Sequence, residues 1–159
     1  MPRRVMEKTP KKKAIVVTVS GGFDPLHIGH VRMFQDAKKL GDRLIVILNN
    51  DHWLRYKKGF VFMPQKERKE IIEAIGCVDK VIYTTHKKGT QDMSICDSLR
   101  KIRPDIFANG GDRKLGNIPE VPVCREIGCR MIFNMGRGGK VQSSSELVHK
   151  SIKAKPKAA

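Results

Sequence analysis

The sequence predicts an α/β fold in which helices flank a doubly wound, parallel, five-stranded sheet. Five short apolar runs rich in β-branched residues are spaced along the chain. The stretches between them have the amphipathic periodicity of helices. Strands that alternate with helices in this way pair in parallel through helical crossovers. The predicted strands are residues 14–20, 43–49, 80–84, 105–109 and 129–134.

The first two predicted helices each present an apolar face. One is expected at about residues 29–40, with Gly41 as its stop. Its apolar face consists of Val31, Phe34, Ala37 and Leu40. The other is expected to begin at Pro64, because proline suits the first position of a helix. It is expected to bury three isoleucines, namely Ile71, Ile72 and Ile75.

Three further helices complete the predicted pattern. One spans about residues 93–102, and Pro104 then turns the chain into the fourth strand. Another spans about residues 120–127 and closes at Gly128. The last begins at the serines of residues 143–145, whose hydroxyls can cap it, and continues toward Ile152. We therefore predict one domain over residues 14–150.

Basic residues are concentrated at both ends of a chain whose formal net charge is +16. Residues 1–13 hold six basic residues and one acidic residue, and four lysines lie among residues 150–157. Such segments attract polyanions. However, they carry no aromatic residues at intervals for base stacking. We predict disordered basic tails at residues 1–13 and 151–159, and nucleic acid is not the expected partner, although the tails leave that contact open.

Cysteine spacing and hydropathy place the chain among cytoplasmic proteins. Its four cysteines form no C-x-x-C pair, so reduced thiols are expected. No stretch approaches the roughly 18 apolar residues of a membrane span, and the N-terminus has no apolar leader core. We therefore expect a soluble, cytoplasmic protein with no membrane partner.

A glycine-rich turn that contains two histidines follows the first strand. Gly21, Gly22 and Gly29 allow the backbone to approach an anion, and a helix start offers free N–H groups. His27 and His30 add further donors. Two alternatives remain: His27 as a structural cap, or both histidines as metal ligands. The other histidines have no matching ligand spacing, so we predict no metal site made by side chains.

Residues 22–30, which read G-F-D-P-L-H-I-G-H, resemble the signature of the cytidylyltransferase-like nucleotidyltransferases, H-x-G-H after a strand. The letters HIGH also mark class I aminoacyl-tRNA synthetases. No K-M-S-K-S-like segment occurs, so the smaller family is expected. The resemblance covers about residues 14–150 and implies a Rossmann-like nucleotide-binding core. It implies catalytic roles for both histidines and nucleotide contacts from Gly21, Gly22, Phe23, Asp24 and Gly29.

Further loops are expected at the same edge of the sheet, because ligands of open parallel sheets bind beyond the carboxyl ends of the strands. These loops are residues 49–51, 109–113 and 135–145. In the second loop, Gly110, Gly111 and Asp112 resemble the G-G-D of the heptose-phosphate adenylyltransferases. The resemblance implies nucleotide contacts from Gly110, Gly111, Asp112, Gln142, Ser143, Ser144 and Ser145.

Cations near this edge supply the remaining candidates. The resemblance implies that a lysine after the second strand holds the triphosphate, and Lys57 matches that position best, with Lys58 second. The acceptor candidates are Arg68, Arg137 and Lys58. For Arg68 two alternatives stay open, a tie between its helix and the active-site loop or a surface ion pair with Glu67 or Asp92.

The resemblance implies transfer of a nucleotidyl group from ATP or CTP, with ATP favoured, to a small phosphorylated acceptor such as a sugar or polyol phosphate. Pyrophosphate leaves, and Mg²⁺ accompanies the nucleotide. One alternative is a cytidylyltransferase that acts on glycerol, ethanolamine or choline phosphate. An alternative of another class is a non-catalytic protein that senses a nucleotide or binds nucleic acid. A homodimer is compatible with each of these hypotheses.

Overall fold

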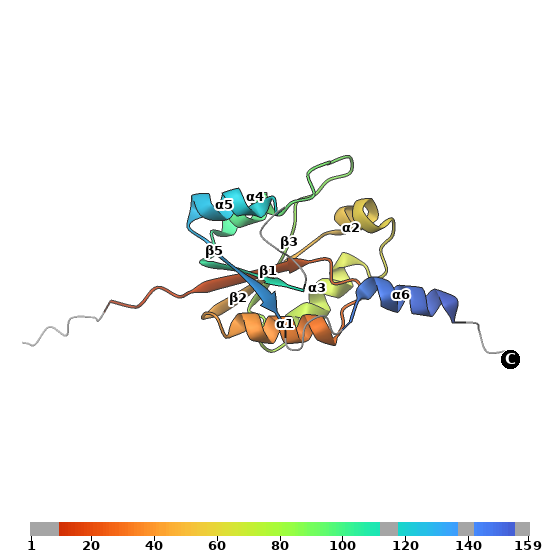
Figure 1. Ribbon diagram of the computed structural model, residues 1–159, viewed down its shortest axis with the longest axis horizontal. Coiled ribbons are helices and arrows are strands. Elements are labelled where there is room, and N and C mark those ends of the chain that lie inside the picture. Colours follow the sequence, from red (N-terminus) through yellow and green to blue (C-terminus); the bar gives the residue numbers. More distant parts are fainter. Residues whose placement is uncertain (1–9, 112–117, 137–141, 155–159) are drawn as a thin grey trace, which may run out of the picture.

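The computed structural model describes residues 10–111, 118–136 and 142–154. Within these residues the chain forms one parallel five-stranded sheet with the strand order β3-β2-β1-β4-β5 (Figure 1). All four strand pairings are parallel, which confirms the predicted fold class. The strands are β1 (Val16–Gly21), β2 (Arg43–Leu48), β3 (Lys80–Tyr83), β4 (Ile106–Gly110) and β5 (Arg130–Met135).

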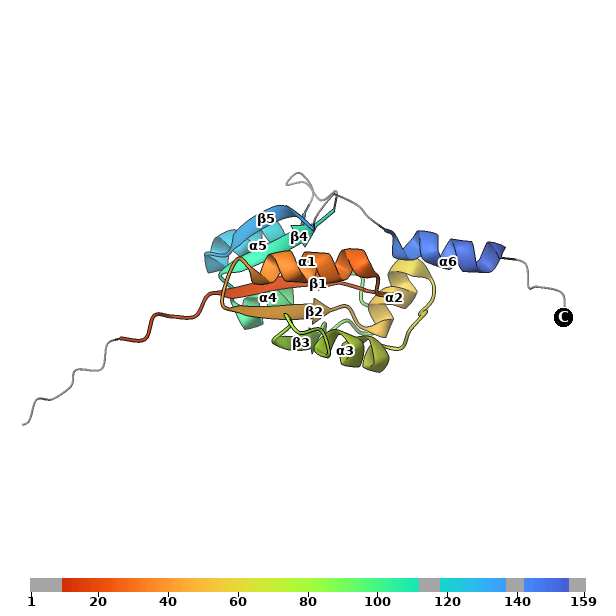
Figure 2. The ribbon, with the colours of Figure 1, turned by 90° about the horizontal axis from the view of Figure 1, so that it is seen from below.

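Helices cover both faces of the sheet. Helices α1 and α3 lie on one face, and α4 and α5 lie on the other (Figures 1 and 2). The helix α6 extends away from the body of the domain (Figures 1 and 2). The helices are α1 (Ile28–Lys38), α2 (Asp51–Lys58), α3 (Gln65–Glu73), α4 (Cys96–Ile102), α5 (Glu120–Ile127) and α6 (Ser144–Lys153). None of the helices in the described ranges is long and apolar enough to cross a membrane.

Two apolar clusters, one on each face, hold the helices to the sheet. Side chains of a strand alternate between the two faces. Accordingly Leu44, Val46 and Leu48 of β2 pack with Phe34 of α1, whereas Ile47 packs on the other face. That second cluster also contains Leu99 of α4, Val123 of α5 and Phe107 of β4. The strands therefore bury side chains on both faces, as a doubly wound sheet requires.

Helix α2 was not predicted from the sequence. The side chain of Asn50 accepts a hydrogen bond from Trp53 N at 3.0 Å and caps the helix. Leu54 is the only residue of α2 that is fully buried. The helix has only eight residues, which is shorter than the roughly 11–18 residues over which helical periodicity is normally recognised.

The structure also corrects the predicted face of the helix after Pro64. Pro64 occupies the N-cap position, so α3 begins at Gln65. Ile71 is 42% exposed, which contradicts its predicted burial, whereas Ile72 is fully buried. Arg68 lies one turn before Ile72 and is also fully buried, although a buried helix position is normally apolar. Residues four apart lie on the same side of a helix, so Arg68 and Ile72 define the buried face.

The later helices match the predictions at most of their ends. α5 begins at Glu120 and closes at Gly128, as predicted. α4 begins at Cys96 instead of residue 93. The Ser143 side chain accepts from Glu146 N and caps α6, which continues to Lys153, past the predicted domain boundary at residue 150. Most of both predicted tails lies outside the described residues.

Candidate active site

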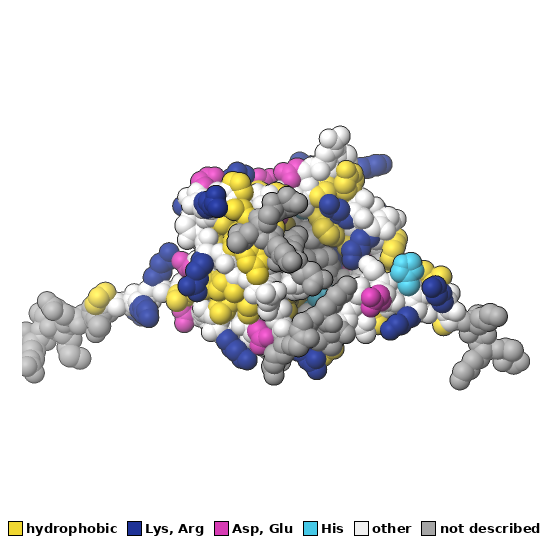
Figure 3. Space-filling model, viewed as in Figure 1, with side chains coloured by type: hydrophobic (Ala, Val, Ile, Leu, Met, Phe, Trp, Pro, Cys, Tyr) yellow, Lys and Arg dark blue, Asp and Glu magenta, His cyan; other side chains and the backbone are white. Residues whose placement is uncertain are grey.

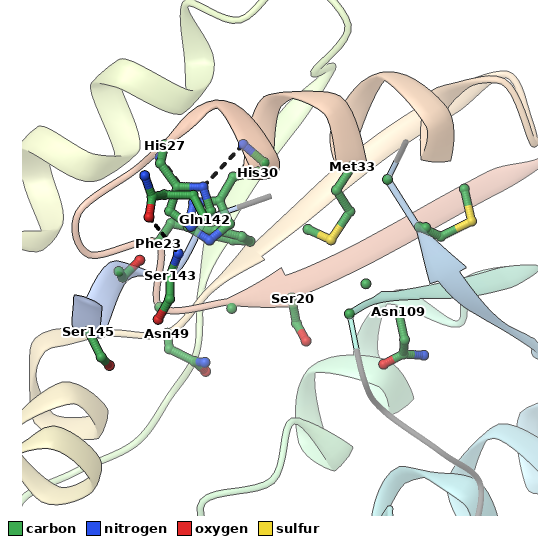
Figure 4. Close-up of a pocket in the computed structure, with 18 of the residues that line it drawn as sticks. Ser20, Phe23, His27, His30, Met33, Asn49, Asn109, Gln142, Ser143 and Ser145 are labelled. Carbon is green, nitrogen blue, oxygen red and sulfur yellow. Dashed lines mark hydrogen bonds between the residues drawn. The ribbon is translucent and has the colours of Figure 1, made fainter. Parts of the chain in front are cut away.

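A cavity of about 420 Å³ lies at the carboxyl ends of the central strands. It is bordered by the ends of β1 and β4, the N-termini of α1 and α6, helix α2 and the segment before α4. The predicted convergence of loops at this edge is therefore observed. Figure 4 shows side chains from these segments pointing toward a common space, among them His27, His30, Asn49 and Ser143.

The two histidines form a reciprocal cap at the start of α1. His27 Nδ1 accepts from Gly29 N at 3.1 Å, and His30 Nδ1 accepts from His27 N at 3.2 Å (Figure 4). The two rings stack with their centroids 3.7 Å apart. A neutral imidazole whose Nδ1 accepts must carry its proton on Nε2. His27 is thus both the structural cap left open by the sequence and a cavity-lining donor.

Both imidazoles are neutral near pH 7. Burial lowers the pKa of His27. Burial, with smaller effects from the charges of His27 and Lys58, lowers the pKa of His30 to about 3. The sequence indicated that both histidines are hydrogen-bond donors but did not indicate their charge. The structure presents neutral Nε2–H groups, whose orientation is fixed by the helix cap.

The Phe23 side chain packs against the His30 ring. It is buried with a positive φ of 49°, and its ring meets the His30 ring edge to face, with centroids 4.9 Å apart. A Cβ atom on Gly21 would lie 2.9 Å from the Phe23 ring. On Gly22 it would lie 2.9 Å from Leu54 Cδ2. The two glycines are thus needed for close packing around Phe23 and α2, in addition to any contact with an anion.

Asp24, predicted to bind nucleotide, does not line the cavity. It is 4% exposed, and its two carboxylate oxygens accept from Phe62 N and Met63 N at 2.7 and 2.6 Å. Asp24 therefore tethers the segment between α2 and α3 to the histidine turn. The sequence could not indicate this, because the donors are backbone groups 38 and 39 residues away.

Arg68, predicted as an acceptor-binding residue, is fully buried beneath the same turn. Its guanidinium donates to the carbonyl oxygens of Met63, Gly22 and Asn49 at 2.7–2.8 Å. It also pairs with Asp51 at 2.6 Å. The acceptor role is therefore wrong, and the alternative of a tie between α3 and the active-site loop is confirmed. The surface ion pair with Glu67 or Asp92 is also wrong.

Only one of the two lysines of α2 lines the cavity. Lys58 lines the cavity, whereas Lys57, the predicted triphosphate ligand, does not. Successive residues of a helix point in directions about 100° apart. The distinction therefore depends on α2 being a helix, which the sequence did not indicate.

The glycine and serine loops lie where they were expected. Gly110, Gly111 and residues 142–145 line the cavity. Ser144 Oγ donates to Pro25 O at 2.8 Å and thereby joins the start of α6 to the histidine turn. Asp112 and Arg137 lie outside the described residues.

An apolar wall on the face of α4 and α5 was missed by the sequence reasoning. Trp53, Met93 and Ile95 line this part of the cavity, and Trp53 Nε1 donates to Met93 O at 3.0 Å. Glu120, at the start of α5, lies beside them and accepts from Ile95 N at 3.1 Å. These residues come from three separate segments without a shared motif, so only the fold brings them together.

The chain is similar in sequence to a known protein family and to several named proteins. The family model described as Cytidylyltransferase-like matches residues 18–135. An FAD synthase of Thermococcus kodakarensis is 40% identical over 104 residues, which are 65% of this chain and 66% of that protein. The bifunctional protein HldE of Syntrophotalea carbinolica is 37% identical over 112 residues, which are 69% of this chain and 22% of that protein. The chain thus spans just under two thirds of the first relative and about a fifth of the second.

A solved structure supports the same fold. It is the lipopolysaccharide core biosynthesis protein from Thermoplasma volcanium GSS1, with a TM-score of 0.63 and 25% sequence identity. The similarity covers 78% of this chain and 98% of that one.

Proposed function

The chain belongs to the cytidylyltransferase-like family, and on that premise we propose that it transfers an adenylyl group from ATP to a small phosphorylated acceptor, with release of pyrophosphate. One observation carries the proposal. Two neutral imidazoles, each with Nε2–H free to donate, stand at a helix N-terminus in the same cavity as the serine-capped start of α6.

The nucleotide fits the α1 side of the cavity. Helix N-termini attract anions through free N–H groups and the helix dipole, and α1 and α6 both begin here. The Nε2–H groups of His27 and His30 would donate to oxygens of the α- and β-phosphates. Lys58 and the hydroxyls of Ser143 and Ser145 would hold the rest of the triphosphate. Gly110 and Gly111 leave room for the nucleoside beside the backbone.

In the proposed reaction an oxygen of the acceptor phosphate forms a bond to the α-phosphorus of ATP. The bond between that phosphorus and the oxygen bridging to the β-phosphorus breaks, and pyrophosphate leaves with that oxygen. The second pKa of a phosphate monoester is near 6, so the nucleophile is largely ionised at pH 7 and no strong base is needed. Catalysis then depends on position and on donors that match the charge developing on the phosphates.

Mg²⁺ would accompany ATP. Within residues 10–111, 118–136 and 142–154 no group of three His, Cys, Asp or Glu residues could hold a metal ion. This fits a cation bound mainly by phosphate oxygens and water, as is common for Mg²⁺ in nucleotide sites. When bound there it neutralises charge on the triphosphate, while the histidines and α6 position the phosphates.

For the acceptor we favour flavin mononucleotide (FMN). The wall made by Trp53, Met93 and Ile95 suits a flat, largely apolar ring, and the hydrogen bond of Trp53 to Met93 holds the indole in place. FAD consists of an adenylyl group joined to the phosphate of FMN. The FAD synthase relatives at 36–40% identity support both ATP and this acceptor.

A sugar phosphate is the second candidate. The similarity to HldE and to the lipopolysaccharide core biosynthesis protein supports it. A nucleic-acid-binding role has less support. The Lys and Arg side chains visible in Figure 3 are spread over that face among neutral and acidic groups and do not gather into one patch.

Pyrophosphate release tests the proposal directly. The purified protein is incubated with Mg²⁺, ATP or CTP, and one acceptor at a time: FMN, a heptose phosphate, glycerol phosphate or choline phosphate. We expect pyrophosphate and FAD, identified by mass, with ATP and FMN. The His30→Ala variant is the control for contaminating activity. Absence of pyrophosphate from every combination with the wild-type protein contradicts the proposed function.

A further inference from the structure

Two buried oxygen atoms in the cavity have no hydrogen-bond partner. In the part of the chain that the structure describes, Asn49 Oδ1 and Glu120 Oε2 are the buried side-chain polar atoms without one. Asn49 is 4% exposed and Glu120 is 3% exposed, and both residues line the same cavity. A buried acceptor without a donor costs about 1–3 kcal/mol, so such atoms are rare unless a ligand or an ordered water supplies the donor.

The position of the Glu120 carboxylate is fixed by its other oxygen. Oε1 accepts from Ile95 N at 3.1 Å, which joins the start of α5 to the residue before α4. This contact leaves Oε2 without a partner, on a residue that lines the same cavity as Trp53 and Met93. An ionised carboxylate oxygen can only accept hydrogen bonds, so the missing partner must be an N–H or an O–H group.

The triphosphate carries no N–H group and would be repelled by a carboxylate. The amino and hydroxyl groups of the nucleoside could donate, but we place the nucleoside beside Gly110 and Gly111. Glu120 is the first residue of α5, and α5 lies on the face of the sheet opposite α1, the helix that begins at the histidine turn (Figure 1). Trp53, Met93 and Ile95, which we assign to the acceptor, line the same cavity as Glu120, and Ile95 N donates to the Glu120 carboxylate.

We propose that Glu120, assisted by Asn49, determines acceptor specificity by accepting a hydrogen bond from a neutral donor on the phosphorylated acceptor. The inference rests on the proposed function. Both candidate acceptors carry such a donor. In FMN it is the imide N–H of the isoalloxazine ring, and in a sugar or polyol phosphate it is a hydroxyl group. An acceptor without that donor leaves the carboxylate buried and unpaired, and is therefore rejected.

Glu120→Gln tests the role of the carboxylate. Glutamine keeps a carbonyl oxygen for Ile95 N and places an NH₂ group where Oε2 was. We expect the KM for FMN to rise about 10-fold or more, because a donor then faces a donor. The Kd for ATP, measured by calorimetry, is expected to stay within about 2-fold, because the α1 side is untouched.

Glu126→Gln is the matched control, since Glu126 lies on the same helix with its side chain 62% exposed and pairs only loosely with Arg100. Asn49→Ala is a second variant that leaves the Ile95 contact intact, and it too should raise the acceptor KM.

N3-methylated FMN and deoxy forms of the sugar phosphate distinguish the two sources of the donor. A loss of turnover with either analogue assigns the donor to the group removed.

The outcomes separate this inference from the proposed function. An unchanged acceptor KM in Glu120→Gln and Asn49→Ala, with the wild-type protein active, overturns the specificity role alone. A weaker ATP affinity with an unchanged acceptor KM also overturns it, because the carboxylate then belongs to the nucleotide side. Absence of transfer by the wild-type protein overturns the proposed function itself. Thermal melting of each variant shows whether the fold is retained.

Discussion

Arg68 Nη1 donates to the carbonyl oxygen of Gly22 at 2.7 Å, across 46 residues of sequence. The same guanidinium donates to Asn49 O and pairs with Asp51. One buried cation thereby links α3, the end of β2, the start of α2 and the turn that leads to His27. The geometry of the histidine turn depends on a residue that has no contact with the cavity.

Arg68→Lys is therefore expected to destabilise the fold. Lysine is a point donor and cannot replace the guanidinium fork, so at least two buried acceptors would lose their partners. We expect the free energy of unfolding to fall by about 2–4 kcal/mol in urea denaturation. Arg125→Lys, the same change at an exposed position of α5, should be nearly neutral. Equal stability of the two variants would contradict the assigned role of Arg68.

His27→Ala and His30→Ala should each lower turnover by about 10²-fold or more, because each removes an Nε2–H donor aimed at the developing charge. The fold should persist, since loss of a helix cap costs only about 1 kcal/mol. Steady-state kinetics with ATP and the active acceptor provide the measurement. His149→Ala, an exposed histidine on α6, is the control. Near-normal turnover in either variant would restrict that histidine to a capping role.

Stability should depend on pH through His30. Its pKa is about 3 in the folded protein, chiefly because of burial, against 6.5 in the unfolded chain. Between these values the unfolded state binds a proton that the folded state does not. The free energy of unfolding should thus decrease as pH falls from 6.5 toward 3, by at most about 1.4 kcal/mol per pH unit from this residue. In the His30→Asn variant the free energy of unfolding should decrease less steeply with falling pH. Equal pH dependence in the variant and the wild-type protein would contradict the assigned role of His30.

Lys58→Ala should weaken ATP binding about 10-fold, because a charge-assisted hydrogen bond to the triphosphate is lost. Lys57→Ala is the matched control on the same helix, since Lys57 does not line the cavity. Calorimetry with ATP and Mg²⁺ distinguishes the two variants. If Lys57→Ala weakened ATP binding more than Lys58→Ala, Lys57 and not Lys58 would be the lysine that contacts the nucleotide.

Gly29→Ala should separate stability from activity. Alanine favours a helix by up to about 1 kcal/mol over glycine, which offsets a weakened His27 cap, so melting should be nearly unchanged. However, the new Cβ would lie 2.9 Å from His27 Cε1 and would displace the imidazole. We expect turnover to fall about 10-fold, since a small misplacement of a donor is costly. Gly76→Ala, where no heavy atom lies within 4 Å, should leave turnover unchanged.

Local patterns were sufficient for several features of this protein. The apolar runs predicted all five strands to within two residues, and the cap and stop residues predicted the bounds of α5 and the start of α6. The glycine-histidine turn was located from its residues alone. These features depend on periodicity and on contacts between neighbours in the chain, which a sequence displays directly.

The sequence by itself thus determined the fold class, the family resemblance and the turn that carries His27 and His30. Only the tertiary structure decided that Arg68 is buried, that Lys58 and not Lys57 lines the cavity, and that Glu120 and Trp53 line the same cavity. It also fixed the strand order and the low pKa of His30. The reason is physical: burial and the donors around a polar group come from segments distant in sequence, and no local pattern records them.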